Sequence, residues 1–154
     1  MNISTQLAKN LRDVYFGGNW TWVSLKDTLA DVNWEQATSK IAGFNTIAAL
    51  VFHIDYFVQV ATKVLQGGPL EGKDELSFDH PPLHSGSDWA EMLENTWKNA
   101  ENFAKLIEQV PEQQLWAIFS DQKYGNYYRN IQGITEHAHY HLGQIVLLKK
   151  LVNV

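Results

Sequence analysis

Hydrophobic residues recur with the 3.6-residue period of an amphipathic helix in four separate segments of the chain. The clearest segment covers 87–109, with Ser87 as its predicted N-cap and Asp88 and Glu91 in the first turn, where the helix dipole favours negative charge. Pro111 marks its end. One face of the segment carries the stripe Trp89, Met92, Leu93, Thr96, Trp97, Ala100, Phe103, Ala104 and Ile107.

The other periodic segments cover residues 4–31, 45–65 and 130–152. The first is interrupted at Gly17–Gly18, and the second begins at a predicted cap, Asn45. No stretch shows the alternation of apolar and polar residues that a half-buried strand needs. The pattern therefore predicts an all-α fold, a bundle of four long helices in which the first helix is broken.

Two long connections join these segments. Residues 66–86 form an irregular joint of a length typical of a crossover or a functional loop. Because a long connection lets consecutive helices of a bundle run parallel, we expect 45–65 and 87–109 to be a parallel pair. The second connection, 116–129, could either cap a pocket or pack over one end of the bundle, and it is rich in aromatic residues: Trp116, Phe119, Tyr124, Tyr127 and Tyr128.

Composition excludes several classes of protein. A chain of 154 residues matches the size of one domain, so we expect residues 1–154 to form a single domain, and 45% hydrophobic residues exclude a disordered chain. A formal net charge of −5 with no Lys/Arg cluster argues against a nucleic-acid partner. The absence of cysteine excludes disulfide scaffolds, thiolate metal sites and cysteine nucleophiles, so any thiol used by this protein comes from outside.

The chain gives no sign of a membrane or export segment. Its first residues, Met-Asn-Ile-Ser-Thr-Gln-Leu, lack the basic region and apolar run of a signal peptide. The longest apolar stretch, Ile47 to Phe57, contains His53 and Asp55 and is shorter than the ~20 residues of a bilayer span. We expect a cytoplasmic protein without a membrane partner.

Three of the six histidines are expected to point inward. His137 and His141 lie four residues apart, so they share one face of the last helix with apolar residues. His53 has apolar neighbours one turn away on either side, at Ala49 and Phe57. The remaining polar candidates are expected to face solvent or to be structural: His139, His80 and His84, the loop acids Glu71 and Asp74, and Asp55 and Tyr56.

A buried imidazole without a partner costs ~1–3 kcal/mol, so three inward histidines need hydrogen bonds or a metal. Two histidines from one helix and a third from a facing helix suit a divalent ion and leave one coordination position open, as in catalytic zinc sites. Gln144 could support the ligands from outside the coordination sphere. Spacing alone leaves an alternative, because His-x-x-x-His arises easily by chance and single core histidines are usually structural.

Three stretches of the chain resemble the DinB/YfiT-like family of bacterial metal-binding four-helix bundles. Residues 133–145, Gly-Ile-Thr-Glu-His-Ala-His-Tyr-His-Leu-Gly-Gln-Ile, are similar to its last-helix motif, and 17–29 and 45–53 resemble its N-terminal half. The resemblance implies a metal on His53, His137 and His141, and often a homodimer. Imidazole ligands do not choose between metals, and we expect one divalent ion, zinc or nickel.

Some relatives transfer a low-molecular-weight thiol, and others have no assigned activity. Leu142 stands where many members have arginine, and Trp20-Thr21-Trp22 replaces a Trp-His-Gly of some members, so the substrate does not carry over. We expect a metal-dependent enzyme that transfers such a thiol to an electrophilic small-molecule substrate lying under the 116–129 loop. The alternatives are a hydrolase using metal-bound water and a non-catalytic, stress-associated metal-binding module; no acid or base is evident beside the site.

The last helix has a second apolar strip beside its histidine face, formed by Tyr140, Leu147 and Leu151. A helix that is apolar most of the way round is buried on more than one side. This strip favours a homodimer, although other helices of the same chain could cover it equally well.

Overall fold

In the computed structural model, residues 2–152 are described, and within that range the chain forms helices and no β-sheet. The predicted all-α class is thus confirmed. The long helices are α1 (Ile3–Phe16), α4 (Ile47–Leu65), α5 (Gly86–Gln109) and α6 (Tyr127–Val152). The shorter elements are α2 (Leu25–Leu29), α3 (Trp34–Thr38) and the 3₁₀ turns η1 (Asp74–Phe78), η2 (Gln114–Trp116) and η3 (Gln122–Tyr124).

The break in the first predicted helix lies where the sequence placed it. α1 ends at Phe16, and Gly17 and Gly18 have φ values of 107° and 105°. This left-handed region is open to glycine at little cost, so the chain can turn here before α2 begins. Residues 17–24 separate the two helices, and α3 is a further short helix that the periodicity did not predict.

Two predicted N-caps are wrong by one or two residues. Ser85, not Ser87, caps α5, because its Oγ accepts the N–H of Asp88 at 3.2 Å. Thr46, not Asn45, caps α4, because its Oγ1 accepts the N–H of Ala49 at 3.1 Å. Both caps have an extended backbone and lie three residues before the N–H that they receive, which is the geometry that capping requires.

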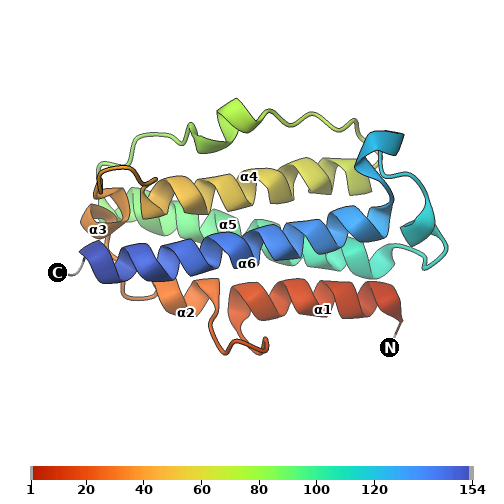
Figure 1. The fold of residues 1–154 in the computed structure, drawn as a ribbon, viewed down its shortest axis with the longest axis horizontal. Helices are drawn as coiled ribbons and strands as arrows, with labels where there is room; N and C mark the ends of the chain where they lie inside the picture. The colour runs from red at the N-terminus through yellow and green to blue at the C-terminus, as the bar shows by residue number, and fades with distance from the viewer. Residues whose placement is uncertain (1, 153–154) are drawn as a thin grey trace.

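The long helices lie side by side, and α4 and α5 run in the same direction while α1 and α6 run the opposite way (Figure 1). The connection between α4 and α5 returns along the length of α4 before α5 begins (Figure 1). The predicted parallel pair and crossover are therefore correct. α4 packs against α5 and α6, and α1 packs against the same two helices.

Every long helix contributes side chains to the shared core. Each fully buried aliphatic side chain contributes ~1.5–3 kcal/mol of transfer free energy. The largest of the fully buried side chains include Tyr15 and Leu11 of α1, Ile54 of α4, Phe103 and Ile107 of α5, and Ile131 and Ile145 of α6.

The aromatic loop between α5 and α6 packs over one end of the helices, which was one of its two predicted roles. Leu115 and Phe119 belong to the core, and the Phe119 ring meets the Tyr127 ring edge-on at 5.1 Å. Trp116 stacks on Tyr128 at the surface. His137 lies ten residues beyond Tyr127 along α6, or about 15 Å. The expected placement of a substrate under this loop is therefore far from the histidine face.

Among the described residues, only α4 is long and apolar enough to cross a membrane. It continues beyond the Ile47–Phe57 stretch to Leu65, so its length alone does not exclude a span. Most of α4 is buried against the rest of the chain, as in the core helix of a soluble protein.

Candidate metal centre

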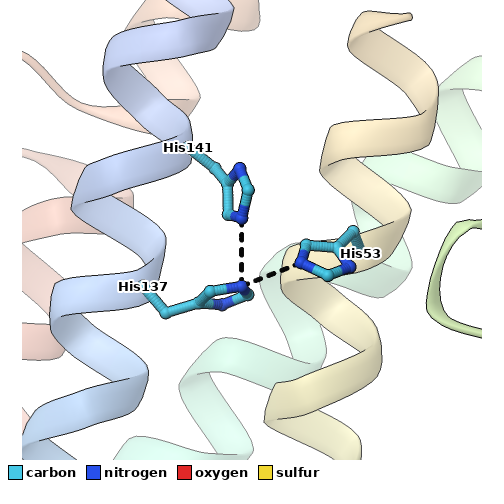
Figure 2. Close-up of side chains that lie close together, drawn as sticks. All are labelled: His53, His137 and His141. Atoms are coloured by element: carbon cyan, nitrogen blue, oxygen red, sulfur yellow. Dashed lines mark hydrogen bonds between the residues drawn. The ribbon is translucent and has the colours of Figure 1, made fainter. Parts of the chain in front are cut away.

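The three inward histidines meet between α4 and α6 (Figure 2). His137 Nε2 lies 2.9 Å from His53 Nε2 and 3.0 Å from His141 Nε2. One ring nitrogen from each residue falls within 4.8 Å of the other two, close enough for a single metal ion. The structure thus brings together the three residues that the helical-face argument selected.

Helix geometry explains the convergence. His137 and His141 are one turn apart on α6, so both rings leave the helix on the side that packs against α4. His53 lies in the middle of α4 and points back at them (Figure 2). His53 and His141 are 5% and 7% exposed, and His137 is half-buried, so solvent supplies little of their hydrogen bonding.

Neighbouring groups decide which nitrogen of two rings carries the proton. His53 Nδ1 lies 2.7 Å from Ser77 Oγ, and this hydroxyl donates its own proton to the backbone oxygen of Asp74 at 2.6 Å. His141 Nδ1 lies 2.6 Å from Gln144 Oε1, an oxygen that only accepts. Both rings therefore donate from Nδ1 and keep a lone pair on Nε2. Gln144 thus contacts His141, as the sequence suggested, on the ring nitrogen that faces away from the cluster.

Burial keeps the rings neutral. Burial, followed by repulsion from His141, lowers the pKa of His53 to about 4. Burial, followed by repulsion from His141 and His53, lowers the pKa of His137 to about 4. Burial also lowers the pKa of His141, while its bond to Gln144 opposes the shift. Neutral imidazole is the form that binds metals.

The negative charge of Asp74 opposes the lowered pKa of both His53 and His137. The sequence predicts that Asp74, like Glu71, is an ordinary solvated loop acid, and its side chain is indeed exposed. Its charge is nevertheless felt at two of the three rings. A divalent ion on those rings would gain from the same attraction.

Hydrogen bonds cannot satisfy the three converging nitrogens. With Nδ1–H on His53 and His141, only His137 can supply a proton to the centre, and one proton cannot complete two bonds of full strength. If His137 places that proton on Nε2, its Nδ1 is left as a buried acceptor without a partner. A cation that accepts all three Nε2 lone pairs removes the conflict at the centre, and the proton of His137 then lies on its buried Nδ1, which has no partner among the described residues.

The separations fit such an ion. Zn–N bonds of ~2.0–2.1 Å in a tetrahedral site place two ligand nitrogens about 3.3 Å apart. The two distances from His137 Nε2, 2.9 and 3.0 Å, are a few tenths of an ångström shorter, and the His53 and His141 nitrogens lie within 4.8 Å of each other, so ring rotations would be needed to bring all three to the ion. The donor set therefore suits one divalent metal ion, with all three ligands of the same chemical kind, and imidazole ligands do not choose the metal.

Two partners of His53 could not be found from the sequence. Ser77 and Phe78 belong to η1 in the crossover, more than twenty residues away along the chain. The Phe78 ring stacks on the His53 ring at a centroid distance of 4.0 Å and an angle of 11°. A serine and a phenylalanine in an irregular connection carry no periodic signal, so only the folded crossover reveals them.

Among the other polar candidates, the structure confirms two expectations and corrects two, at His80 and His139. Tyr56 Oη accepts the N–H of Lys73 at 2.8 Å, and His84 is exposed, as expected. His80 is half-buried rather than solvated, because its ring lies against Phe52. The expectation that His139 faces outward is wrong, since it is half-buried and its Nε2 is buried with no hydrogen-bond partner within the described range.

Comparisons of the chain with family models, with curated proteins and with solved structures give no match. What the structure establishes is an all-helical chain with three adjacent, largely buried histidines that are close enough to bind a metal ion.

Proposed function

We propose that this protein is a metal-dependent enzyme with a DinB/YfiT-like four-helix-bundle architecture. The observation that carries the proposal is the convergence of three neutral Nε2 atoms whose lone pairs the chain itself cannot satisfy. The packing of α1, α4, α5 and α6 and the last-helix motif around His137 and His141 support the same reading.

The metal is one divalent ion, zinc or nickel, held by His53, His137 and His141. Three protein ligands leave a coordination position open, the usual arrangement of a catalytic zinc site. When bound, the ion supplies a positive charge that lowers the pKa of a thiol or water at that position. The chain's own residues keep the three rings neutral and hold two of them in the metal-binding tautomer.

Thiol transfer is the reaction that suits this chain best. In it, the sulfur of a low-molecular-weight thiolate attacks an electrophilic carbon of a small-molecule substrate, a C–S bond forms, and the leaving group departs with its electron pair. A thiolate needs less help from a general base than water does. Among the described residues, the side chains that hydrogen-bond the three rings from outside the cluster are Ser77 and Gln144, and neither is an acid or a base. The same observation makes a hydrolase the weaker alternative.

A non-catalytic metal-binding module is the second candidate function. In that case the ion would mainly tie α4 to α6, since each of those helices provides at least one ligand. The favouring observation is again the lack of an acid or base in contact with the three rings. If metal raises the melting temperature of the protein but no thiol binds to the metal-loaded form, this non-catalytic role is the correct one.

A homodimer is proposed for the outer face of α6. Tyr140, Leu147 and Leu151 are 66%, 54% and 43% exposed. The alternative expectation, that other helices of the same chain cover this strip, is therefore wrong. A large apolar patch of this kind marks an interaction surface. Light scattering of Leu147→Glu against the parent protein tests it; a parent monomer at micromolar concentration would contradict the dimer.

The function is tested with protein purified without a histidine tag and loaded with zinc or nickel. Several low-molecular-weight thiols are supplied together with a haloarene, and C–S bond formation is followed by absorbance. We expect thiol- and metal-dependent turnover that disappears in His53→Ala. If no thiol binds to loaded protein and the substitution lowers only the melting temperature, the non-catalytic module is the correct function.

A further inference from the structure

The crossover between α4 and α5 is seated on α4 at a small number of points. Near its start, the backbone N–H of Lys73 donates to Tyr56 Oη. In η1, Ser77 is fully buried and its hydroxyl reaches His53. Its neighbour Phe78 covers one face of the same ring. The segment thus approaches the histidine cluster through one hydrogen bond and one aromatic stack.

The direction of the Ser77 bonds follows from counting protons. A serine hydroxyl has one proton, and Ser77 Oγ lies 2.6 Å from the backbone oxygen of Asp74, which can only accept. The hydroxyl therefore donates to Asp74 and has only lone pairs left for His53 Nδ1 at 2.7 Å. His53 must carry its proton on Nδ1, which leaves its Nε2 unprotonated and facing His137.

The ring of His53 is also fixed in orientation. Phe78 stacks on one face at 4.0 Å, and Phe57 meets the ring edge-on at 5.1 Å. A flip of the ring would exchange nitrogen and carbon positions, so the buried Ser77 hydroxyl would lose its donor and Nε2 would leave the centre. Losing a buried hydrogen bond in this way is unfavourable.

We infer that Ser77 is a positioning residue for the metal centre: it fixes the tautomer and direction of His53, and through it η1 is coupled to metal binding. This inference rests on the proposed metal site. Outer partners of ligand histidines typically change metal affinity by 10–100-fold when they are removed. Coupling is reciprocal, so an ion that binds more tightly when η1 is seated also holds η1 more firmly on α4.

Ser77→Ala is the test variant, and Ser77→Thr restores the hydroxyl. Ser4→Ala is the matched control, because Ser4 is also fully buried and donates to a backbone oxygen, that of Val110 at 2.6 Å, on α1. Circular dichroism and melting curves establish that each variant is folded. Zinc affinity is measured by competition with a chromophoric chelator.

We expect Ser77→Ala to bind zinc at least 10-fold more weakly, while Ser4→Ala matches the parent and Ser77→Thr recovers most of the loss. Imidazole ¹⁵N shifts of metal-free protein provide a readout that a general loss of stability does not move. In the parent they are expected to report Nδ1–H on His53, and in Ser77→Ala a mixture of tautomers. Zinc is further expected to slow amide exchange of η1 in the parent and to do so less in Ser77→Ala.

The outcomes separate this inference from the proposal on which it rests. If the parent takes up neither zinc nor nickel, the metal centre itself is refuted. If the parent binds zinc and Ser77→Ala binds it equally well with an unchanged His53 tautomer, the metal centre stands and the role of Ser77 is refuted. If Ser4→Ala loses as much affinity as Ser77→Ala, the effect is one of stability and the inference is also overturned.

Discussion

Two buried polar residues of α4, His53 and Asp55, lie two positions apart and face different helices with different hydrogen-bonding partners. His53 faces α6, where its Nε2 approaches His137 Nε2 at 2.9 Å. Asp55 lies on the α5 side, where Asn99 Nδ2 donates to both carboxylate oxygens at 3.1 and 3.0 Å. Gln59 Nε2 adds a third bond at 2.7 Å. Both residues are at most 7% exposed.

The difference between the two regions is whether the chain completes the hydrogen bonding by itself. Asp55 has internal donors for both oxygens, and although burial raises its pKa to about 6, the bonds from Asn99 and Gln59 oppose that shift. The histidine cluster has more lone pairs than protons. A polar group that is satisfied internally is structural, whereas a set that shares one deficiency marks the place for a ligand.

Cavity size alone would have favoured the wrong side of α4 for a metal. A cavity of about 540 Å³ lies between α4, α5 and the crossover, with Asp55, Gln59 and Asn99 in its wall. None of the three histidines lines it. The chemistry of the donors, rather than the volume, distinguishes the candidate centre.

The largest effect is expected from the metal itself. Zinc at ~1,000 times its Kd should raise the free energy of unfolding by about 4 kcal/mol, or the melting temperature by roughly 10 °C, because it binds only the folded site. His137→Ala/His141→Ala should lose both the bound metal and this shift. Differential scanning calorimetry with metal analysis measures both effects. If the two proteins contain equal amounts of metal, the metal is not bound by these histidines, and a hydrogen-bonded cluster without metal is the better account.

Removing Asp55 should separate the two regions. Asp55→Ala removes the acceptor of the half-buried Asn99 amide and of the exposed Gln59 amide, which water can partly replace, so we expect a loss of about 1–2 kcal/mol in the free energy of unfolding. Because these contacts lie on the α5 side, zinc stoichiometry should be unchanged. Urea unfolding measures the free energy, and metal analysis measures the zinc stoichiometry. If Asp55→Ala also loses zinc, the Asp55 region and the histidine cluster form one site.

Tyr15 tests an unsatisfied group on the Asp55 side. Its hydroxyl is buried with no hydrogen-bond partner in the described structure, so Tyr15→Phe should be neutral or stabilising by about 1 kcal/mol. Burial, followed by the charge of Asp55, raises the pKa of Tyr15. The stability tied to its proton is therefore fully present below the unfolded pKa of ~10 and is lost as the pH rises above it.

Tyr15→Phe should accordingly weaken the fall in stability above pH 10, as measured by urea midpoints between pH 8 and pH 11. The parent contains five other tyrosines, so the comparison is between the two proteins and not with a flat line. An identical alkaline decline in both would show that Tyr15 ionises freely in the folded protein.

The smallest effect is expected at His139, which lies between the two proposed ligands of α6. Its Nε2 is buried without a partner, yet it does not belong to the converging group. His139→Leu should change the free energy of unfolding by less than about 1 kcal/mol and leave zinc uptake intact, because it removes an unsatisfied atom while keeping an apolar contact. If His139→Leu loses zinc, His139 is a metal ligand and the assignment of the ligands on α6 is wrong.

Much of the site was predictable because helical periodicity is a local property. The four-residue spacing of His137 and His141 places both on one face whatever packs against it, and the apolar neighbours of His53 indicate which way that face turns. His139 shows the limit of this reasoning. Its position opposite the core side of α6 predicts exposure, but the folded chain half-buries it there.

The sequence by itself determined the helical class, the break at Gly17–Gly18 and the pair of histidines on α6, because each depends on residues within a few turns of one another. Only the tertiary structure decided that His53 Nε2 completes the cluster and that Ser77 sets its proton. Those facts depend on the crossover returning over α4, and an irregular connection has no repeating pattern from which its contacts can be read. The packing of distant segments, not local preference, makes the three nitrogens meet.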